Sequence, residues 1–117
     1  MPTSRRLFGD AGERAAEQEL IRRGLRVLAR NARTRYGELD LVCHDGDGFV
    51  FVEVKTRRGG SFVQAIEAID GRKLDRLTRL AEAWLALHGL RAAQWRVVLL
   101  AVTVHRDRTV AEFIETA

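Results

Sequence analysis

The sequence predicts an α/β fold in which a mixed central β-sheet is flanked by helices. Helical patterns cover residues 11–23 and 71–88, and strand patterns lie between and after them in the order α-β-β-β-α-β-β. The 117 residues suffice for one hydrophobic core, so we expect a single domain over residues 1–117. The strand after the long helix can lie parallel to the third strand through a right-handed crossover.

The N-terminal segment predicts a loose basic arm over residues 1–8, followed by a helix from Ala11 to Arg23. Asp10 lies three residues before Glu13, which is the spacing of a capping box, and a glycine at position 24 is suited to end the helix. Helical spacing puts Glu13 at the N-terminal end of the inward face. Glu13 therefore has two candidate roles: an acid that complements the helix dipole, or an acid directed at a site.

A hairpin is predicted from Gly37 to Lys55, after a short strand at 25–29 and a polar connection at 31–36. The stretch Asp-Gly-Asp-Gly at 45–48 has the composition of a tight turn. If residues 46 and 47 form the loop, Asp40 faces Glu53 and Glu38 faces Lys55.

Both faces of this hairpin carry apolar side chains, which predicts that its strands lie inside a sheet. One face is expected to carry Leu39, Leu41, Val50, Val52 and Val54, and the other Val42, Phe49 and Phe51. Two carboxylates opposed beside an interior strand either share a proton or share a cation.

The C-terminal half predicts a basic loop at 56–60, a short helical segment from Ser61 through Ile69, and a long helix at 71–88 that ends before Gly89. Apolar residues of the long helix recur at helical spacing and predict core packing: Leu74, Leu77, Ala81, Trp84 and Leu85. Residues 95–104 predict a strong strand and 108–114 a weaker, edge-like one.

The net charge of +4 is carried mostly by arginine, whose planar fork suits phosphate, so nucleic acid is a reasonable partner. Codon usage could produce the same bias. One cysteine, Cys43, excludes an internal disulfide and is expected to be a small buried residue facing away from Asp40. His44, His88 and His105 lack zinc-site spacing. No signal peptide or membrane-spanning run is evident, so we expect a cytoplasmic protein without membrane contact.

The residues with chemical content are Asp40 and, after twelve further residues, Glu53-Val54-Lys55. A carboxylate pair across adjacent strands is a suitable binding site for Mg²⁺. The ion usually takes one or two protein carboxylates and leaves coordination positions open for phosphate oxygens. Lys55 could orient or deprotonate the attacking water or hold a phosphate oxygen. The alternative is an exposed strand end with a surface ion pair between Glu38 and Lys55.

Several motifs together resemble the YraN family of small bacterial proteins, within the PD-(D/E)XK nuclease superfamily and related to archaeal Holliday-junction resolvases. The motifs are Gly12-Glu13, Asn31 to Arg33, Gly37-Glu38-Leu39-Asp40, Phe51 to Lys55 and Lys73. The resemblance implies a restriction-endonuclease-like core and a Mg²⁺- or Mn²⁺-dependent endonuclease acting on branched or structured DNA, and it is compatible with a homodimer.

The resemblance also implies roles for individual residues. Asp40 and Glu53 would be metal-binding acids, the Val54 carbonyl a further ligand, Lys55 the catalytic lysine, and Glu13 an additional acid of the site. Basic residues near the acids are candidates for phosphate binding: Arg33, Arg35, Arg57, Arg58 and Lys73. Two other hypotheses stay open, a nucleic-acid-binding module that does not cut, and a partner-binding protein without nucleic acid.

Overall fold

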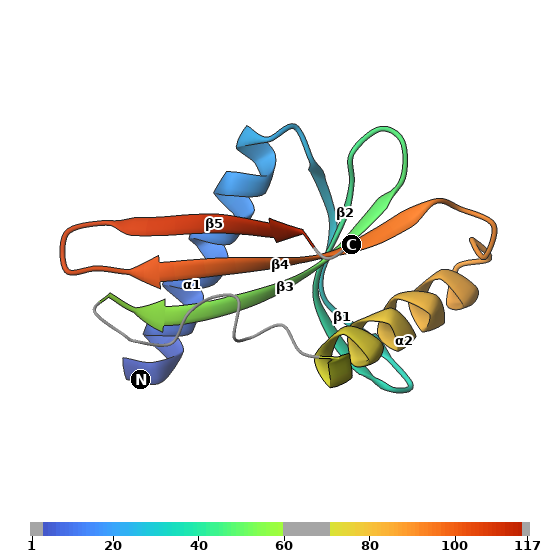
Figure 1. The fold of residues 1–117 in the computed structure, drawn as a ribbon, viewed down its shortest axis with the longest axis horizontal. Coiled ribbons are helices and arrows are strands. Elements are labelled where there is room, and N and C mark those ends of the chain that lie inside the picture. The colour runs from blue at the N-terminus through green and yellow to red at the C-terminus, as the bar shows by residue number, and fades with distance from the viewer. Residues whose placement is uncertain (1–3, 60–70, 116–117) are drawn as a thin grey trace.

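The computed structural model describes residues 4–59 and 71–115, and its elements follow the predicted α-β-β-β-α-β-β order (Figure 1). The elements are α1 (Ser4–Arg22), β1 (Arg26–Thr34), β2 (Gly37–His44), β3 (Phe49–Arg58), α2 (Gly71–Leu87), β4 (Trp95–Val104) and β5 (Thr109–Glu115). The predicted short helix at 61–69 lies outside the described residues.

The five strands form one mixed sheet in the order β1-β2-β3-β4-β5. β3 pairs antiparallel with β2 and parallel with β4, so the expectation that it is an interior strand is confirmed. β5 pairs antiparallel with β4 at one edge of the sheet, as its weaker pattern predicted. The mixed α/β fold class is therefore confirmed.

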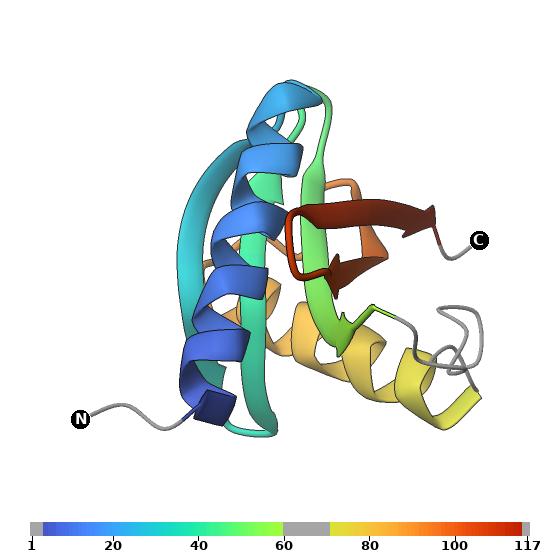
Figure 2. The same ribbon diagram turned by 90° about the vertical axis from the view of Figure 1, so that its left-hand side faces the viewer.

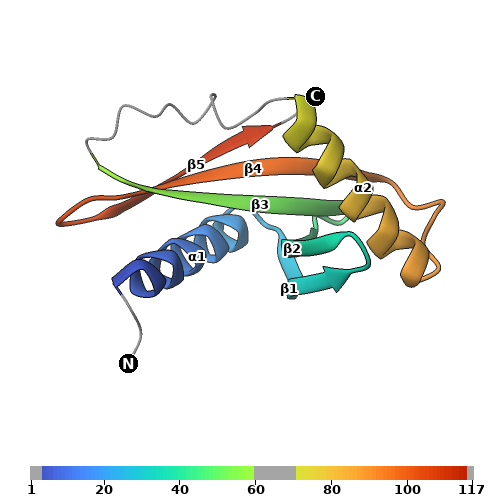
Figure 3. The ribbon, with the colours of Figure 1, turned by 90° about the horizontal axis from the view of Figure 1, so that it is seen from below.

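The two helices cover opposite faces of the sheet and each closes its own hydrophobic cluster (Figures 2 and 3). On one face, Ala16 and Leu20 of α1 are fully buried in a cluster with Cys43 and residues of β2 to β4. On the other face, the predicted apolar stripe of α2 packs against Phe51, with Trp84 in edge-to-face contact at 5.7 Å between ring centroids. Burial of apolar side chains on both faces makes the sheet the centre of the fold.

The predicted hairpin turn and its register are confirmed near the turn. The Asp45 Oδ1 atom accepts hydrogen bonds from the backbone N–H groups of Asp47 and Gly48, and Gly46 has φ of 100°. The β2–β3 pairs run from His44 opposite Phe49 to Leu41 opposite Val52, which is the predicted register.

Beyond Leu41 and Val52 the two strands separate into a fork. The first half of β2 stays paired with β1, as far as Gly37 opposite Thr34, while the second half of β3 stays paired with β4, as far as Arg58 opposite Val104. Figure 1 shows the β1–β2 hairpin turning steeply across the long β3, β4 and β5 strands. The predicted direct pairing of Asp40 with Glu53, and of Glu38 with Lys55, lies beyond the end of the ladder.

The fork also corrects the predicted face of Leu39. Leu39 packs in the α2 cluster, whereas Leu41, two residues later, packs in the α1 cluster. Simple alternation would place both on one face. Because β2 twists away from β3 at Asp40, the alternation is interrupted there.

The predicted boundaries at the N-terminus are wrong. α1 begins at Ser4, so residues 4–8 are not a loose arm and Asp10 lies inside the helix instead of capping it. Arginine and leucine in this stretch are good helix formers, and they extend the helix past a local capping signal. Glu13 is consequently well inside α1, so its proposed first-turn role at the helix dipole does not apply.

Two strands extend into segments predicted as loops. β1 includes residues 31–34, because this polar edge pairs with β2 up to Thr34. β3 includes residues 56–58, which pair with β4 opposite Val102, Thr103 and Val104. Tertiary pairing overrides the weak strand propensity of these polar and basic residues.

Gly12 allows α1 to lie directly against β3. A Cβ atom added at Gly12 would stand 2.3 Å from Thr56 Oγ1 and 2.7 Å from Thr56 Cγ2. Such distances leave no room for any larger residue without movement of α1 or of the Thr56 side chain. The contact therefore fixes the height of α1 over β3 and brings its next residue, Glu13, to the C-terminal half of that strand.

We expect Gly12→Ala to lower the free energy of unfolding by about 1–3 kcal/mol, because the added methyl group overpacks the contact with Thr56. Urea unfolding measures the change. Gly71→Ala is the matched control, since its Cβ meets nothing within 4 Å, and it should be close to neutral. Adding Thr56→Ala to the Gly12 variant should restore part of the loss. A Gly12→Ala protein as stable as the original would contradict the account of this contact.

Candidate functional site

Asp40 lies at the point where β2 and β3 separate. Its Oδ2 atom accepts a hydrogen bond from the backbone N–H of Val54 at 2.7 Å, and the side chain is partly buried. The Val54 N–H points toward β2, where the ladder has already ended at Leu41 and Val52. The carboxylate thus takes the place of a backbone carbonyl of β2. It accepts the hydrogen bond of the Val54 N–H, which would otherwise have no partner where the two strands separate.

Burial raises the pKa of the Asp40 carboxyl group above its ordinary value, and the Val54 hydrogen bond offsets only part of this effect. The negative charges of Glu53, Glu13 and Glu38 raise the pKa of Asp40 further. Three elements, α1, β2 and β3, therefore direct negative charge at one corner of the sheet. This is the environment in which a carboxylate binds either a proton or a cation.

Glu53 faces α2 and is held by two cations of that helix. Arg76 donates a hydrogen bond of 2.6 Å from its guanidinium group to Glu53 Oε1, and Lys73 Nζ lies 3.6 Å from Oε2. The Glu53 side chain is only 14% exposed. Its Oε2 atom is buried and accepts no hydrogen bond within the described part of the chain, so one oxygen has unused capacity to bind a ligand.

The remaining predicted site residues lie around this pair. Lys55 follows on β3, has an exposed side chain, and by strand alternation shares the α2-facing side with Glu53. Glu13 is exposed on α1 and close enough to influence Asp40. The predicted ion pair between Glu38 and Lys55 is replaced by a contact from Glu38 to Arg33, opposite it on β1, at 4.0 Å.

The predicted phosphate-binding residues do not form a single cluster. Lys73 lies at the acids and Arg33 contacts Glu38. Arg57 and Arg58 lie on β3 beyond Lys55, where Arg57 donates to Thr103 Oγ1 at 3.3 Å. Arg35 is in the β1–β2 turn, with its guanidinium carbon 5.2 Å from the Tyr36 ring centroid.

The donor set at the fork fits a hard divalent cation in its chemistry. Asp40 and Glu53 offer carboxylate oxygens, and one Glu53 oxygen is buried and accepts no hydrogen bond from the residues that the structure describes. Across residues 12–59 and 71–112, whose side chains are described, however, no three acidic, histidine or cysteine side chains are arranged as a ready-made metal site. Glu53 would have to exchange Arg76 and Lys73 for the cation, with its charge neutralised in either arrangement.

Sequence reasoning missed Arg76 as a partner of Glu53. The available signal was its spacing, three residues after Lys73 on α2, which places both side chains on adjacent turns of one flank. It also missed the Asp40–Val54 hydrogen bond, because that bond depends on where the ladder ends. Cys43 is buried in the α1 cluster as expected, and burial raises the pKa of its thiol to about 12.

The described helices are too short or too polar to span a membrane.

Comparison with solved structures defines the class of fold. The structure of Archaeoglobus fulgidus Hjc, a Holliday junction resolvase from an archaeal hyperthermophile, is similar with a TM-score of 0.51. The match covers 92% of this chain and 76% of that chain at 16% sequence identity. The chain thus resembles the restriction-endonuclease-like fold of that protein, and the acids of the fork lie on its β2 and β3 strands.

Residues 12–106 match the Uncharacterised protein family UPF0102, and the chain belongs to this family, which is the YraN family that its motifs resembled. A UPF0102 protein of Chloroflexus aurantiacus is 44% identical over 94% of this chain and 90% of its own length. A UPF0102 protein of Kineococcus radiotolerans is 48% identical over 82% of this chain and 80% of its own length.

In EDTA, we expect Asp40→Asn to raise the free energy of unfolding at pH 7. Burial disfavours the charged carboxylate, whereas asparagine is neutral and can still accept the Val54 N–H. Because the folded pKa of Asp40 is above its ordinary value, the folded state binds the proton more tightly. The unsubstituted protein therefore gains stability from this group as the pH falls, and loses it as the pH rises through the folded pKa.

The stability advantage of Asp40→Asn should accordingly be largest at neutral pH and shrink as the pH falls toward 3.8, the ordinary pKa of an aspartate side chain. Urea unfolding at a series of pH values measures it. Asp47→Asn, which removes an exposed carboxylate in the hairpin turn, serves as the control and should show no such trend. A destabilised Asp40→Asn protein at pH 7 would show that the Asp40 charge is compensated in the fold.

Proposed function

We propose that this protein is a Mg²⁺- or Mn²⁺-dependent endonuclease that hydrolyses phosphodiester bonds in branched or structured DNA. The observation that carries the proposal is the fork between β2 and β3, where the partly buried Asp40 carboxylate lies near the charge of Glu53, and one buried Glu53 oxygen accepts no hydrogen bond within the described residues. The fold similarity to a Holliday junction resolvase supports the same class of reaction.

Four groups of the chain would hold the cation: the Asp40 and Glu53 carboxylates, the Val54 carbonyl and, from α1, the Glu13 carboxylate. A divalent cation bound there would supply Lewis-acid chemistry, acidifying a water molecule and neutralising charge that develops on phosphorus. The Val54 carbonyl is a favourable ligand for the cation because the Val54 N–H already holds the Asp40 carboxylate beside β3.

The basic residues would act on the phosphate. Lys55 extends from the same strand as Glu53 and would hold a phosphate oxygen or orient the attacking water. Lys73 and Arg76 pair with Glu53 in the absence of a ligand. On exchange for a cation, their side chains would be released next to the bound phosphate, where charge-assisted hydrogen bonds are strong.

A second candidate is a nucleic-acid-binding module that keeps the fold but does not cut. The ion pairs of Glu53 with Lys73 and Arg76 favour this alternative, because cations of the protein already neutralise the carboxylate. The intact set of Asp40, Glu53 and Lys55 favours catalysis.

The test is a cleavage panel of single-stranded, duplex, flap and four-way DNA with Mg²⁺ or Mn²⁺. We expect cleavage of a branched substrate that falls to background in Asp40→Ala and Glu53→Ala, and by about 10²-fold or more in Lys55→Ala. Asp107→Ala, which removes an exposed acid between β4 and β5, is the matched control and should retain activity.

Full cleavage by the Asp40 and Glu53 variants would refute the proposed site. Tight binding of branched DNA without cleavage under either metal would instead establish the binding module. Loss of activity in the Asp107 control would indicate that the assay reports general damage to the protein.

A further inference from the structure

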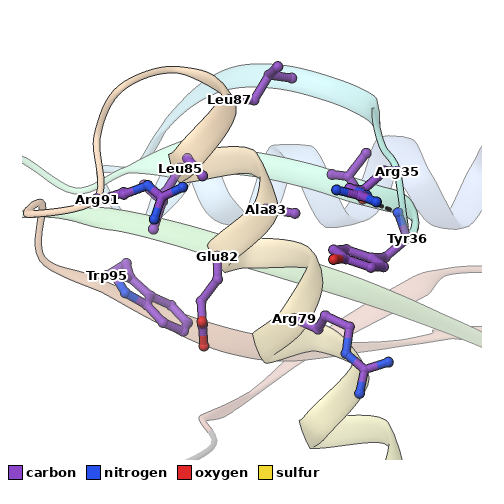
Figure 4. A pocket seen from close by; sticks show the side chains of 11 residues that line it. Arg35, Tyr36, Arg79, Glu82, Ala83, Leu85, Leu87, Arg91 and Trp95 are labelled. Atoms are coloured by element: carbon purple, nitrogen blue, oxygen red, sulfur yellow. Dashed lines mark hydrogen bonds between the residues drawn. The ribbon is translucent and has the colours of Figure 1, made fainter.

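A cavity of about 740 Å³ lies between the β1–β2 turn and α2, outside the group of acids at the fork (Figure 4). Aromatic and apolar side chains line it together with charged ones. Tyr36 and Trp95 are the aromatic residues, and Leu87 is an apolar residue that is 70% exposed. A cavity that combines an exposed ring, a half-buried ring and charge is suited to a ligand having both a flat apolar part and a charged part.

Tyr36 forms a fixed aromatic platform in this cavity. The Thr34 Oγ1 atom accepts a hydrogen bond from the Tyr36 N–H and donates one to the Gly37 carbonyl, which holds the turn. A Cβ atom at Gly37 would be 3.4 Å from Leu80 of α2, so the turn is packed against the helix. Tyr36 is nevertheless 53% exposed as a residue, which leaves part of its surface available for stacking.

Three arginines surround the Tyr36 ring. Arg35 and Arg79 have their guanidinium carbons 5.2 Å and 5.9 Å from the Tyr36 ring centroid, and Arg91 lines the cavity from beyond α2. Within residues 12–59 and 71–112, none of the three forms an ion pair. Their charge is therefore available to an anionic ligand.

One acid, Glu82, also lines the cavity. Figure 4 shows Glu82 beside Trp95, directed away from the end of the cavity that holds Tyr36 and Arg35. A carboxylate there repels a purely anionic ligand, but it can accept hydrogen bonds from the amino group of a nucleobase. The combination matches a nucleotide better than an inorganic anion.

The cavity is connected to the acids at the fork by one flank of α2. Lys73 and Arg76 contact Glu53, and Arg79, three residues further, lies over Tyr36. Three residues correspond to about 4.5 Å along a helix axis. A DNA strand that has one phosphate bound at the fork would thus be directed toward the cavity by the basic side chains of α2.

We propose that this cavity binds one unpaired nucleotide of a DNA strand that continues from the cleavage site. Tyr36 stacks on the base, and Arg35, Arg79 and Arg91 bind the adjoining phosphates. The inference rests on the proposed nuclease function and narrows its substrate class: the DNA has an unpaired segment next to the scissile phosphate, as in a flap or a splayed arm.

The test measures the binding of a short single-stranded oligodeoxynucleotide in EDTA. Fluorescence anisotropy at several salt concentrations reports the affinity. We expect Tyr36→Ala to weaken binding about tenfold and Tyr36→Phe to preserve it, because the stacking ring is retained. Arg79→Ala should weaken binding and reduce the salt slope by about 0.7, whereas Tyr36→Ala should leave that slope unchanged.

Arg106→Ala is the matched control, since it removes an exposed arginine outside the cavity, and it should bind as the unsubstituted protein does. Thermal melts confirm folding of every variant. The proposal is overturned if Tyr36→Ala and Arg79→Ala bind no more weakly than Arg106→Ala. It is also overturned if an acidic peptide of equal charge binds equally well, because the base then contributes nothing.

The cavity and the nuclease site can fail separately. Binding that depends on Tyr36 and Arg79, in a protein that cuts no DNA, would support the cavity and reject the nuclease. Metal-dependent cleavage of a flap that Tyr36→Ala leaves unchanged, together with unchanged binding, would support the nuclease and reject the cavity.

Discussion

The structure depends on the hydrogen bond between the Asp40 carboxylate and the Val54 N–H at 2.7 Å. This bond gives the Val54 N–H an acceptor at the point where β2 separates from β3. The first half of β2 can therefore stay paired with β1, while the second half of β3 stays paired with β4. The same bond holds a carboxylate where burial and three other carboxylates disfavour its charge. One interaction therefore creates the fork and the electrostatic character of the site in it.

The charges at the fork are balanced asymmetrically. Glu53 is neutralised by Lys73 and Arg76 from α2, whereas within the described residues the Asp40 carboxylate accepts only the hydrogen bond of the Val54 N–H. A divalent cation would compensate both acids at once and would free two basic side chains on a helix flank that continues to Arg79 and Tyr36. We infer that one event, the replacement of Lys73 and Arg76 by a cation at Glu53, has three consequences. The cation is bound, the phosphate is bound, and the DNA strand is directed along α2.

The sequence predicted the element order, the interior position of β3 and the register near the hairpin turn, because strong apolar patterns and turn residues are local signals. It failed where tertiary pairing decides: β1 and β3 run past their apolar stretches, and α1 starts at Ser4 despite the capping signal at Asp10. Of the candidate site, the two acids were identifiable from their spacing. Arg76 and the cavity at Tyr36 were not, since both depend on how α2 lies across the sheet.

The most direct test of the central claim is a calorimetric titration of Mn²⁺ into the metal-free protein. We expect a binding event that is lost in Asp40→Asn and in Glu53→Gln and retained in Asp47→Asn, whose exposed carboxylate lies at the far end of the hairpin. Unchanged Mn²⁺ binding in Asp40→Asn and Glu53→Gln would contradict the claim that the fork between β2 and β3 is the cation site.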